Sequence, residues 1–233
     1  MSARTPLVLL PGLLCDGALW RHQTDTLADI AGITVADLTG DDCLEDMARS
    51  VLETAPETFA LAGLSMGGYV AQAVMRHAPD RVTRLALLDT SARADTPEQS
   101  ENRRAFIEQT RHGDFKGVTS RLLPMLIHAD RLEDGDLTGT IMAMAERVGK
   151  EAFLRQQNAI MNRPDGRRDL GAIHCPALVL CGREDALTPL AGHQEMAAGL
   201  PNSKLVVIED CGHMAPLERP RAVSAVMRYW LQA

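Results

Sequence analysis

A serine, an aspartate and a histidine, the residue types that together activate a hydroxyl nucleophile, each occur within a few residues after an apolar run. Ser65 lies within Gly63–Gly68, between the apolar run Thr58–Ala62 and a helix-like stretch. Gly-x-Ser-x-Gly between a strand and a helix is typical of a nucleophile elbow, a sharp turn that exposes the serine. A serine hydroxyl is a weak nucleophile at neutral pH, so this chemistry also needs a base and an orienting carboxylate.

The candidate acid and base follow two later apolar runs. Asp185 follows the run Ala177–Cys181, and His213 follows the run Lys204–Ile208. Functional loops of open α/β sheets gather at the carboxyl ends of the strands. The three loops can therefore bring Ser65, Asp185 and His213 together as nucleophile, orienting acid and general base.

Other interpretations of these residues remain open. Glu184 adjoins Asp185, and Asp89 ends another strand-like run, so both compete with Asp185 for the role of the acid. Ser65 could be an ordinary helix N-cap, and His213 alone could be a structural histidine. The combined context favours Ser65, His213 and Asp185.

A developing oxyanion requires preorganised N–H donors. The backbone N–H of Met66, directly after the serine, is one candidate. The loop after the first apolar run should supply the other, and Leu13 is preferred over Leu14. The side chains proposed to line a substrate pocket are apolar residues near these loops or in a later helical segment: Leu14, Met125, Met142, Met161 and Met214.

The strand-like runs are continuously apolar, which is typical of strands buried on both faces of a parallel sheet. They are Pro6–Leu10, Ile33–Leu38, Phe59–Gly63, Thr83–Leu88, Ala177–Cys181 and Lys204–Ile208. Helices are expected between and after them, at Leu44–Thr54, Met66–His77, Pro189–Leu200 and Arg219–Leu231. The alternation predicts an α/β fold with a doubly wound sheet.

The stretch 91–170 contains no convincing strand. Its pattern predicts helices at Pro97–Arg111, Phe115–Ile127, Asp134–Val148 and Lys150–Asn162. We expect a helical cap over residues 91–170, inserted into a core formed by residues 1–90 and 171–233.

The bulk composition excludes several classes of function. The net charge of −7 and the absence of a basic stripe argue against binding to nucleic acid or to an anionic membrane surface. With no secretory signal or transmembrane run, a cytoplasmic location is expected. The five cysteines are expected to be free thiols, no zinc spacing is present, and neither a metal nor an organic cofactor is expected.

Four motifs in order resemble the α/β-hydrolase superfamily: Leu9–Gly12, Gly63–Gly68, Pro176–Asp185 and Cys211–Pro220. They are most similar to small carboxylesterases of the pimeloyl-carrier-protein methyl ester esterase and 3-oxoadipate enol-lactonase type. The resemblance implies Ser65 as nucleophile, His213 as base and Asp185 as acid.

The chain departs from the family pattern in two places. Family members usually carry His-Gly in the oxyanion loop, where this chain has Pro11-Gly12, and only five residues precede the first strand. The antiparallel hairpin that opens the family sheet is therefore expected to be missing. We predict about six parallel strands in the spatial order 2-1-3-4-5-6, with a helical cap.

The expected function is hydrolysis of a carboxylic ester through an acyl-enzyme. Aromatic residues make up only 3% of the chain, which favours a small or medium aliphatic acyl group. The same triad would also serve a lactonase, a carbon–carbon bond hydrolase or a perhydrolase, and a non-catalytic binding protein could retain it. An acyl carrier protein is a candidate partner, through the arginines of the helical stretch: Arg103, Arg104, Arg111, Arg121, Arg155, Arg167 and Arg168.

Overall fold

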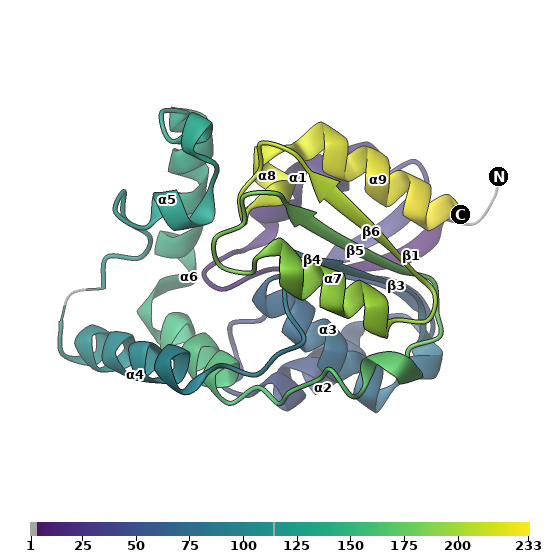
Figure 1. Ribbon diagram of the computed structural model, residues 1–233, viewed down its shortest axis with the longest axis horizontal. Coiled ribbons are helices and arrows are strands. Elements are labelled where there is room, and N and C mark those ends of the chain that lie inside the picture. The colour runs from purple at the N-terminus through teal and green to yellow at the C-terminus, as the bar shows by residue number, and fades with distance from the viewer. Residues whose placement is uncertain (1–3, 114) are drawn as a thin grey trace.

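A six-stranded parallel sheet forms the centre of the protein in the computed structural model, which describes residues 4–113 and 115–233 (Figure 1). The spatial order is β2-β1-β3-β4-β5-β6, as predicted, and every strand pair in these residues is parallel. The strands are β1 (Thr5–Leu10), β2 (Ala31–Val35), β3 (Phe59–Leu64), β4 (Val82–Leu88), β5 (Ala177–Gly182) and β6 (Ser203–Ile208). The start of the chain, on which the expectation of no secretory signal partly rests, lies outside the described residues.

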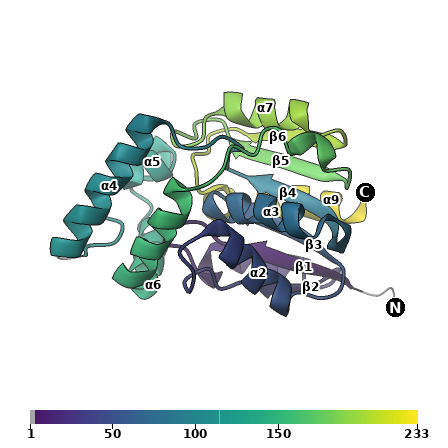
Figure 2. The ribbon, with the colours of Figure 1, turned by 90° about the horizontal axis from the view of Figure 1, so that it is seen from below.

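Helices cover both faces of this sheet (Figures 1 and 2). Along β1, Val8 and Leu10 belong to one buried cluster, whereas Leu7 and Leu9 belong to another on the opposite face. The first cluster includes residues of α2 (Leu44–Thr54), α3 (Met66–His77) and α7 (Leu190–Gly199); the second includes residues of α1 (Arg21–Leu27), α8 (Ala215–Glu218) and α9 (Pro220–Gln232). Burial on both faces explains why the strands are continuously apolar.

The second strand ends earlier than the sequence predicts. The expected strand was Ile33–Leu38, but β2 ends at Val35, and only the N–H of Ala36 still bonds to a neighbouring strand, at Leu9. Leu38 is buried in the core without pairing in the sheet. Its apolar character therefore reflects packing into the core from a loop. Helix α1 was not predicted, and α8 precedes the expected C-terminal helix as a separate short turn.

Helices α4 (Pro97–His112), α5 (Leu123–Leu126) and α6 (Gly135–Met161) lie between β4 and β5 in the chain, beyond the carboxyl ends of the strands (Figure 2). The predicted helix Phe115–Ile127 is wrong over most of its length, because only Leu123–Leu126 is helical. Gly117 has a φ of 58°, a left-handed conformation that breaks a helix, and Val118 packs against the core from an irregular segment. The boundaries of the cap at residues 91 and 170 remain a prediction.

The helices predicted at Asp134–Val148 and Lys150–Asn162 correspond to the two halves of α6. The halves meet at Gly149, whose φ of 78° and ψ of 178° are not helical. That conformation is accessible essentially only to glycine. Gly149 therefore fixes the kink that turns the second half of α6. No helix in the described residues combines the length and apolarity needed to cross a membrane.

Two glycines of α6 should respond oppositely to substitution by alanine. A Cβ would meet no atom within 4 Å at either Gly139 or Gly149, so only backbone conformation separates them. Gly149→Ala should destabilise the protein by about 1–3 kcal/mol because of its backbone conformation. Gly139→Ala, within the regular helix, should stabilise it by about 0.5–1 kcal/mol.

Urea unfolding of both variants beside the wild type measures this difference. In thermal unfolding of a chain of this size, each kcal/mol of stability corresponds to a shift of about 2–4 °C in Tm. Equal effects of the two substitutions would contradict a kink imposed by Gly149.

Candidate active site

Ser65 lies in a strained turn between β3 and α3. Its φ is 53° and its ψ is −114°, a conformation that costs energy for a residue with a side chain. A Cβ on Gly63 would overlap the backbone of Gly67, and one on Gly67 would overlap the carbonyl of Leu10. The strand and the helix thus approach more closely than any side chain at these positions allows. The sequence pattern of two glycines around a serine identified this turn.

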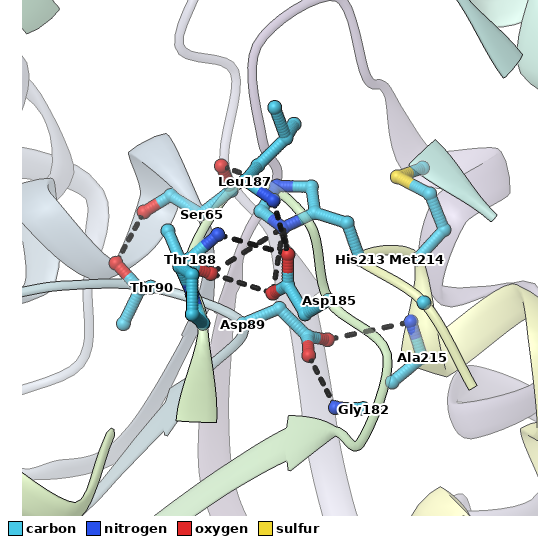
Figure 3. Close-up of polar contacts among 12 residues, drawn as sticks. Ser65, Asp89, Thr90, Gly182, Asp185, Leu187, Thr188, His213, Met214 and Ala215 are labelled. Carbon is cyan, nitrogen blue, oxygen red and sulfur yellow. Dashed lines mark hydrogen bonds and ion pairs between the residues drawn. The ribbon is translucent and has the colours of Figure 1, made fainter. Parts of the chain in front are cut away.

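The side chain of His213 lies between Ser65 and Asp185 (Figure 3). Its Nε2 is 2.9 Å from the Oγ of Ser65, and its Nδ1 is 2.9 Å from Oδ2 of Asp185. The side chains of His213 and Asp185 are almost completely buried. Residues from three loops, separated by up to 148 positions, therefore form one chain of hydrogen-bonding groups.

Asp185 is held as a carboxylate by several donors. Its Oδ1 accepts from the N–H groups of Leu187 and Thr188, both at 2.9 Å, and its Oδ2 accepts from the hydroxyl of Thr188 at 2.6 Å. Burial is the largest influence on its pKa and acts to raise it. The nearby charge of His213 and the hydrogen bonds from His213 and Thr188 outweigh burial and hold the pKa below its usual value.

The two competing carboxylates have other contacts. Asp89 is fully buried and accepts from the N–H groups of Gly182, at 2.9 Å, and Ala215, at 3.3 Å (Figure 3). Burial, together with the charge of Asp185, raises the pKa of Asp89 well above its usual value. Glu184 accepts from the N–H of Cys211 at 3.0 Å. Among the described carboxylates, Asp185 is the one in contact with His213.

The loop after β1 lies directly against Ser65. A Cβ added to Gly12 would be 3.4 Å from the Cβ of Ser65. The N–H of Leu14 is taken, because it donates to Oε1 of Gln156 at 3.0 Å. No protein acceptor is found in the described part of the chain for the N–H of Leu13 or of Met66. These are the two donors that the sequence nominated for an oxyanion.

The five apolar residues predicted to line a substrate pocket lie in different environments. Leu14 and Met214 are buried within the same loops as Leu13 and His213. Met161 is half-buried at the end of α6, whereas Met125 and Met142 are 49% and 38% exposed on α5 and α6. Their role in substrate binding remains a prediction.

Glu218 supports the loop that carries His213, a role that the sequence analysis did not identify. Its buried carboxylate accepts from the N–H groups of Gly212 and Met214, each at 3.1 Å, and from that of His128 at 2.7 Å. The N–H of His213 in turn donates to the carbonyl of Leu126 at 3.0 Å. The segment around α5 is therefore part of the support of His213. Glu218 lies within the motif Cys211–Pro220, but nothing in the motif reveals its partner in another segment.

His193 is a second supporting residue that the sequence did not reveal. Its Nε2 accepts from the N–H of Thr90 at 3.0 Å, while the hydroxyl of Thr90 donates to the carbonyl of Ser65 at 2.7 Å. Nδ1 of His193 lies 3.4 Å from the carbonyl of Pro189. Burial lowers the pKa of His193 to about 4, so the ring is neutral at pH 7.

The described residues contain no group of three or more His, Cys, Asp or Glu side chains that could hold a metal ion. All five cysteines are free. Burial raises the pKa of the Cys15 and Cys181 thiols to about 12, which makes their thiolates scarce at neutral pH.

A doubly wound parallel sheet with a strained serine turn after its third strand is the architecture of an α/β hydrolase. A model of the alpha/beta hydrolase family matches residues 7–226. The chain therefore belongs to the α/β-hydrolase family.

Individual relatives agree with this assignment. The chain is 32% identical to a thermophilic esterase from Thermogutta terrifontis, with a TM-score of 0.89 over 98% of this chain and 89% of that one. The enol-lactonase from Burkholderia xenovorans LB400 shares the fold, with 24% identity and a TM-score of 0.89 over 100% of this chain and 93% of the other. The pimeloyl-[acyl-carrier protein] methyl ester esterase of Nitrosomonas europaea is 26% identical over 92% of this chain and 90% of its own length.

The depressed pKa of His193 predicts a loss of stability in acid. The unfolded chain binds a proton near the ordinary value of 6.5, whereas the folded protein binds it only near 4. The stabilisation is therefore complete above pH 6.5 and is lost as pH falls toward 4, by up to about 3 kcal/mol. In His193→Gln, a neutral amide should replace both hydrogen bonds of the ring and remove this contribution.

Urea unfolding of both proteins at pH 7 and pH 4.5 measures the effect. The wild type should lose more free energy of unfolding between these values than His193→Gln does. Parallel losses in the two proteins would contradict a buried neutral His193.

Proposed function

We propose that the protein is a serine hydrolase that cleaves carboxylic esters through an acyl-enzyme intermediate. The observation that carries this proposal is the continuous contact from Ser65 Oγ through both ring nitrogens of His213 to Asp185. This is the arrangement that allows a serine to act as a nucleophile at neutral pH.

The first half-reaction forms the acyl-enzyme. The Oγ of Ser65 attacks the ester carbonyl carbon while Nε2 of His213 takes the hydroxyl proton. The N–H groups of Leu13 and Met66 donate to the oxyanion of the tetrahedral intermediate. His213 then transfers its proton to the departing alkoxide, the carbon–oxygen bond of the ester breaks, and the alcohol leaves.

The second half-reaction releases the acid. His213 removes a proton from water, which attacks the acyl-enzyme carbonyl. The bond between the acyl carbon and Oγ of Ser65 then breaks, and His213 returns the proton to Oγ as the acid leaves. Asp185 accepts a hydrogen bond from Nδ1 of His213 throughout, which fixes the tautomer and stabilises the imidazolium. Each residue thus returns to its starting state.

The proposed substrates are esters of small or medium aliphatic acids. The paucity of aromatic residues argues against a pocket built for stacking on rings, and the apolar residues Leu14 and Met214 are the chain neighbours of Leu13 and His213. The 32%-identical relative from Thermogutta terrifontis, described as an esterase, supports ester chemistry.

The proposal predicts that Ser65→Ala abolishes hydrolysis of p-nitrophenyl esters and that Asp185→Asn lowers kcat by about 10⁴-fold. Glu184→Gln is the matched control, because the neighbouring carboxylate contacts Cys211 instead of His213 and its amide retains an acceptor. This control should keep kcat within about threefold, as expected for a residue that takes no part in the chemistry.

The measurement is steady-state hydrolysis of esters from acetate to laurate, with fluorophosphonate labelling as a test of the nucleophile. Full turnover by Ser65→Ala would refute the proposed nucleophile. A labelled wild type that acts in lactone, diketone or peracid assays but on none of the open-chain esters would instead assign these residues to a lactonase, a carbon–carbon bond hydrolase or a perhydrolase. Tight ligand binding without labelling or turnover would indicate a binding protein.

An acyl ester carried by an acyl carrier protein is a second substrate to test, because the Nitrosomonas europaea relative is named for that reaction. Arg104 is exposed on α4, whereas Arg103 pairs with Asp95 at 2.6 Å and with Gln157. Reversing the charge of Arg103 would therefore disturb the fold as well as the surface charge. Arg104→Glu changes the surface charge without breaking these contacts, so it is the better variant for this test.

If α4 docks an acidic carrier protein, Arg104→Glu should lower kcat/KM for the carrier-bound ester several-fold, chiefly through association, at about 50 mM salt. Its kcat/KM for p-nitrophenyl esters should equal that of the wild type. Equal losses on both substrates, or no loss on either, would exclude this surface as the docking site.

A further inference from the structure

The loop that carries Leu13 is held from outside by one buried side chain. Gln156, on the second half of α6, is 1% exposed, and its amide forms two long-range hydrogen bonds. Oε1 accepts from the N–H of Leu14 at 3.0 Å, and Nε2 donates to the carbonyl of Leu38 at 3.1 Å. The donor and the acceptor fix the orientation of the amide, since its nitrogen cannot accept from the N–H of Leu14.

The backbone of this loop adopts a conformation that its own residues do not favour. The N–H of Cys15 donates to the carbonyl of Gly12 at 3.1 Å, which closes a four-residue turn. Its third residue, Leu14, has a φ of 58°. A positive φ at this position belongs to type II turns and favours glycine, whereas leucine favours the type I turn with a negative φ.

The two turn types differ in the peptide between Leu13 and Leu14, which points in opposite directions in them. The N–H of Leu14 reaches Gln156 only in the observed form. From within the turn, the thiol of Cys15 donates to the carbonyl of Leu13 with Sγ at 3.5 Å from the oxygen, a weak hydrogen bond to the same peptide. The bond to Gln156, the stronger of these two contacts to the Leu13–Leu14 peptide, therefore stabilises the less favoured turn.

Helix α6 contacts the same loop in two further places. Nε and Nη2 of Arg147 lie 2.7 and 3.1 Å from the carboxylate of Asp16, which also accepts from the N–H of Ala18. The side chain of Leu14 packs against Ala145 and Phe153. Helix α6, more than 100 residues away in the chain, thus holds the loop through both polar and apolar contacts.

We propose that Gln156 is a positioning residue for the oxyanion site: by anchoring the Leu13–Leu14 peptide of the Gly12–Cys15 turn, it fixes the adjoining backbone of Leu13, whose N–H then faces the carbonyl oxygen of the substrate. This inference rests on the proposed function, because it assigns Leu13 as an oxyanion donor. Gln156 itself touches neither Ser65 nor His213 among the described hydrogen bonds. Its effect on catalysis passes through the peptide of Leu14.

The test replaces Gln156 by methionine, which has a similar length but forms no hydrogen bond to the loop. For p-nitrophenyl esters, Gln156→Met should lower kcat by about 10–100-fold, up to the loss seen when one oxyanion donor is removed, with KM within about threefold. Gln157→Met is the matched control, because Gln157 is the next residue of the same helix and is also buried, but bonds to Arg103. This control should retain the kcat of the wild type.

A second readout separates positioning from a general loosening of the fold. An alkyl trifluoromethyl ketone forms a hemiketal in which the Oγ of Ser65 bonds to the carbonyl carbon, His213 keeps the serine proton, and the former carbonyl oxygen becomes an oxyanion. Its affinity should fall in Gln156→Met by the same factor as kcat/KM, because both depend on the oxyanion donors. Arg147→Gln, which removes only an exposed ion pair, should shift both quantities together by a smaller factor.

The outcomes separate this inference from the proposed function. A wild type without turnover or Ser65 labelling would refute the proposed function itself. An active wild type with a fully active Gln156→Met would overturn only the role of Gln156. If Gln156→Met does not fold, Arg147→Gln decides: a loss of kcat without a parallel loss of ketone affinity, or no loss of either, refutes positioning by α6.

Discussion

The close approach of β3 and α3 is the constraint on which the candidate site depends. Gly63 and Gly67 let the strand and the helix pack so tightly that Ser65 is left at a φ of 53°, with its hydroxyl at the carboxyl edge of the sheet. The hydroxyl of Thr90 and the carbonyl of Leu88 hold the backbone of this turn. The strain is tolerated because both faces of the sheet are buried under helices, so the turn cannot relax without disrupting the core.

The helical segment between β4 and β5 supports the loops of the site as well as covering them. Leu126 accepts from the N–H of His213, Glu218 joins His128 to the same loop, and Gln156 holds the loop of Leu13. These bonds are buried or half-buried, where loss of one partner leaves a polar group without compensation. The geometry of both loops therefore depends on the position of this segment.

The pKa values of two nearby aspartates are shifted in opposite directions by their surroundings. Asp185 has a neighbouring histidine and three further donor contacts from its own loop, which together keep its pKa low. Asp89, in a fully buried position, accepts from two backbone donors among the described residues, and its pKa is raised by burial and by the charge of Asp185. The carboxylate whose pKa stays low, Asp185, is also the one in contact with His213, where a negative charge can stabilise an imidazolium.

The sequence by itself determined the features encoded by local spacing. The apolar runs gave the six strands, glycines around Ser65 gave the turn, and helix signals placed α2 and α3 with their observed bounds. Local spacing failed where apolar residues pack from irregular backbone, as in the wrongly predicted helix Phe115–Ile127. Only the tertiary structure revealed Gln156, Glu218 and His193, because each acts through a partner in a distant segment, and no periodic pattern marks a hydrogen bond across 142 residues.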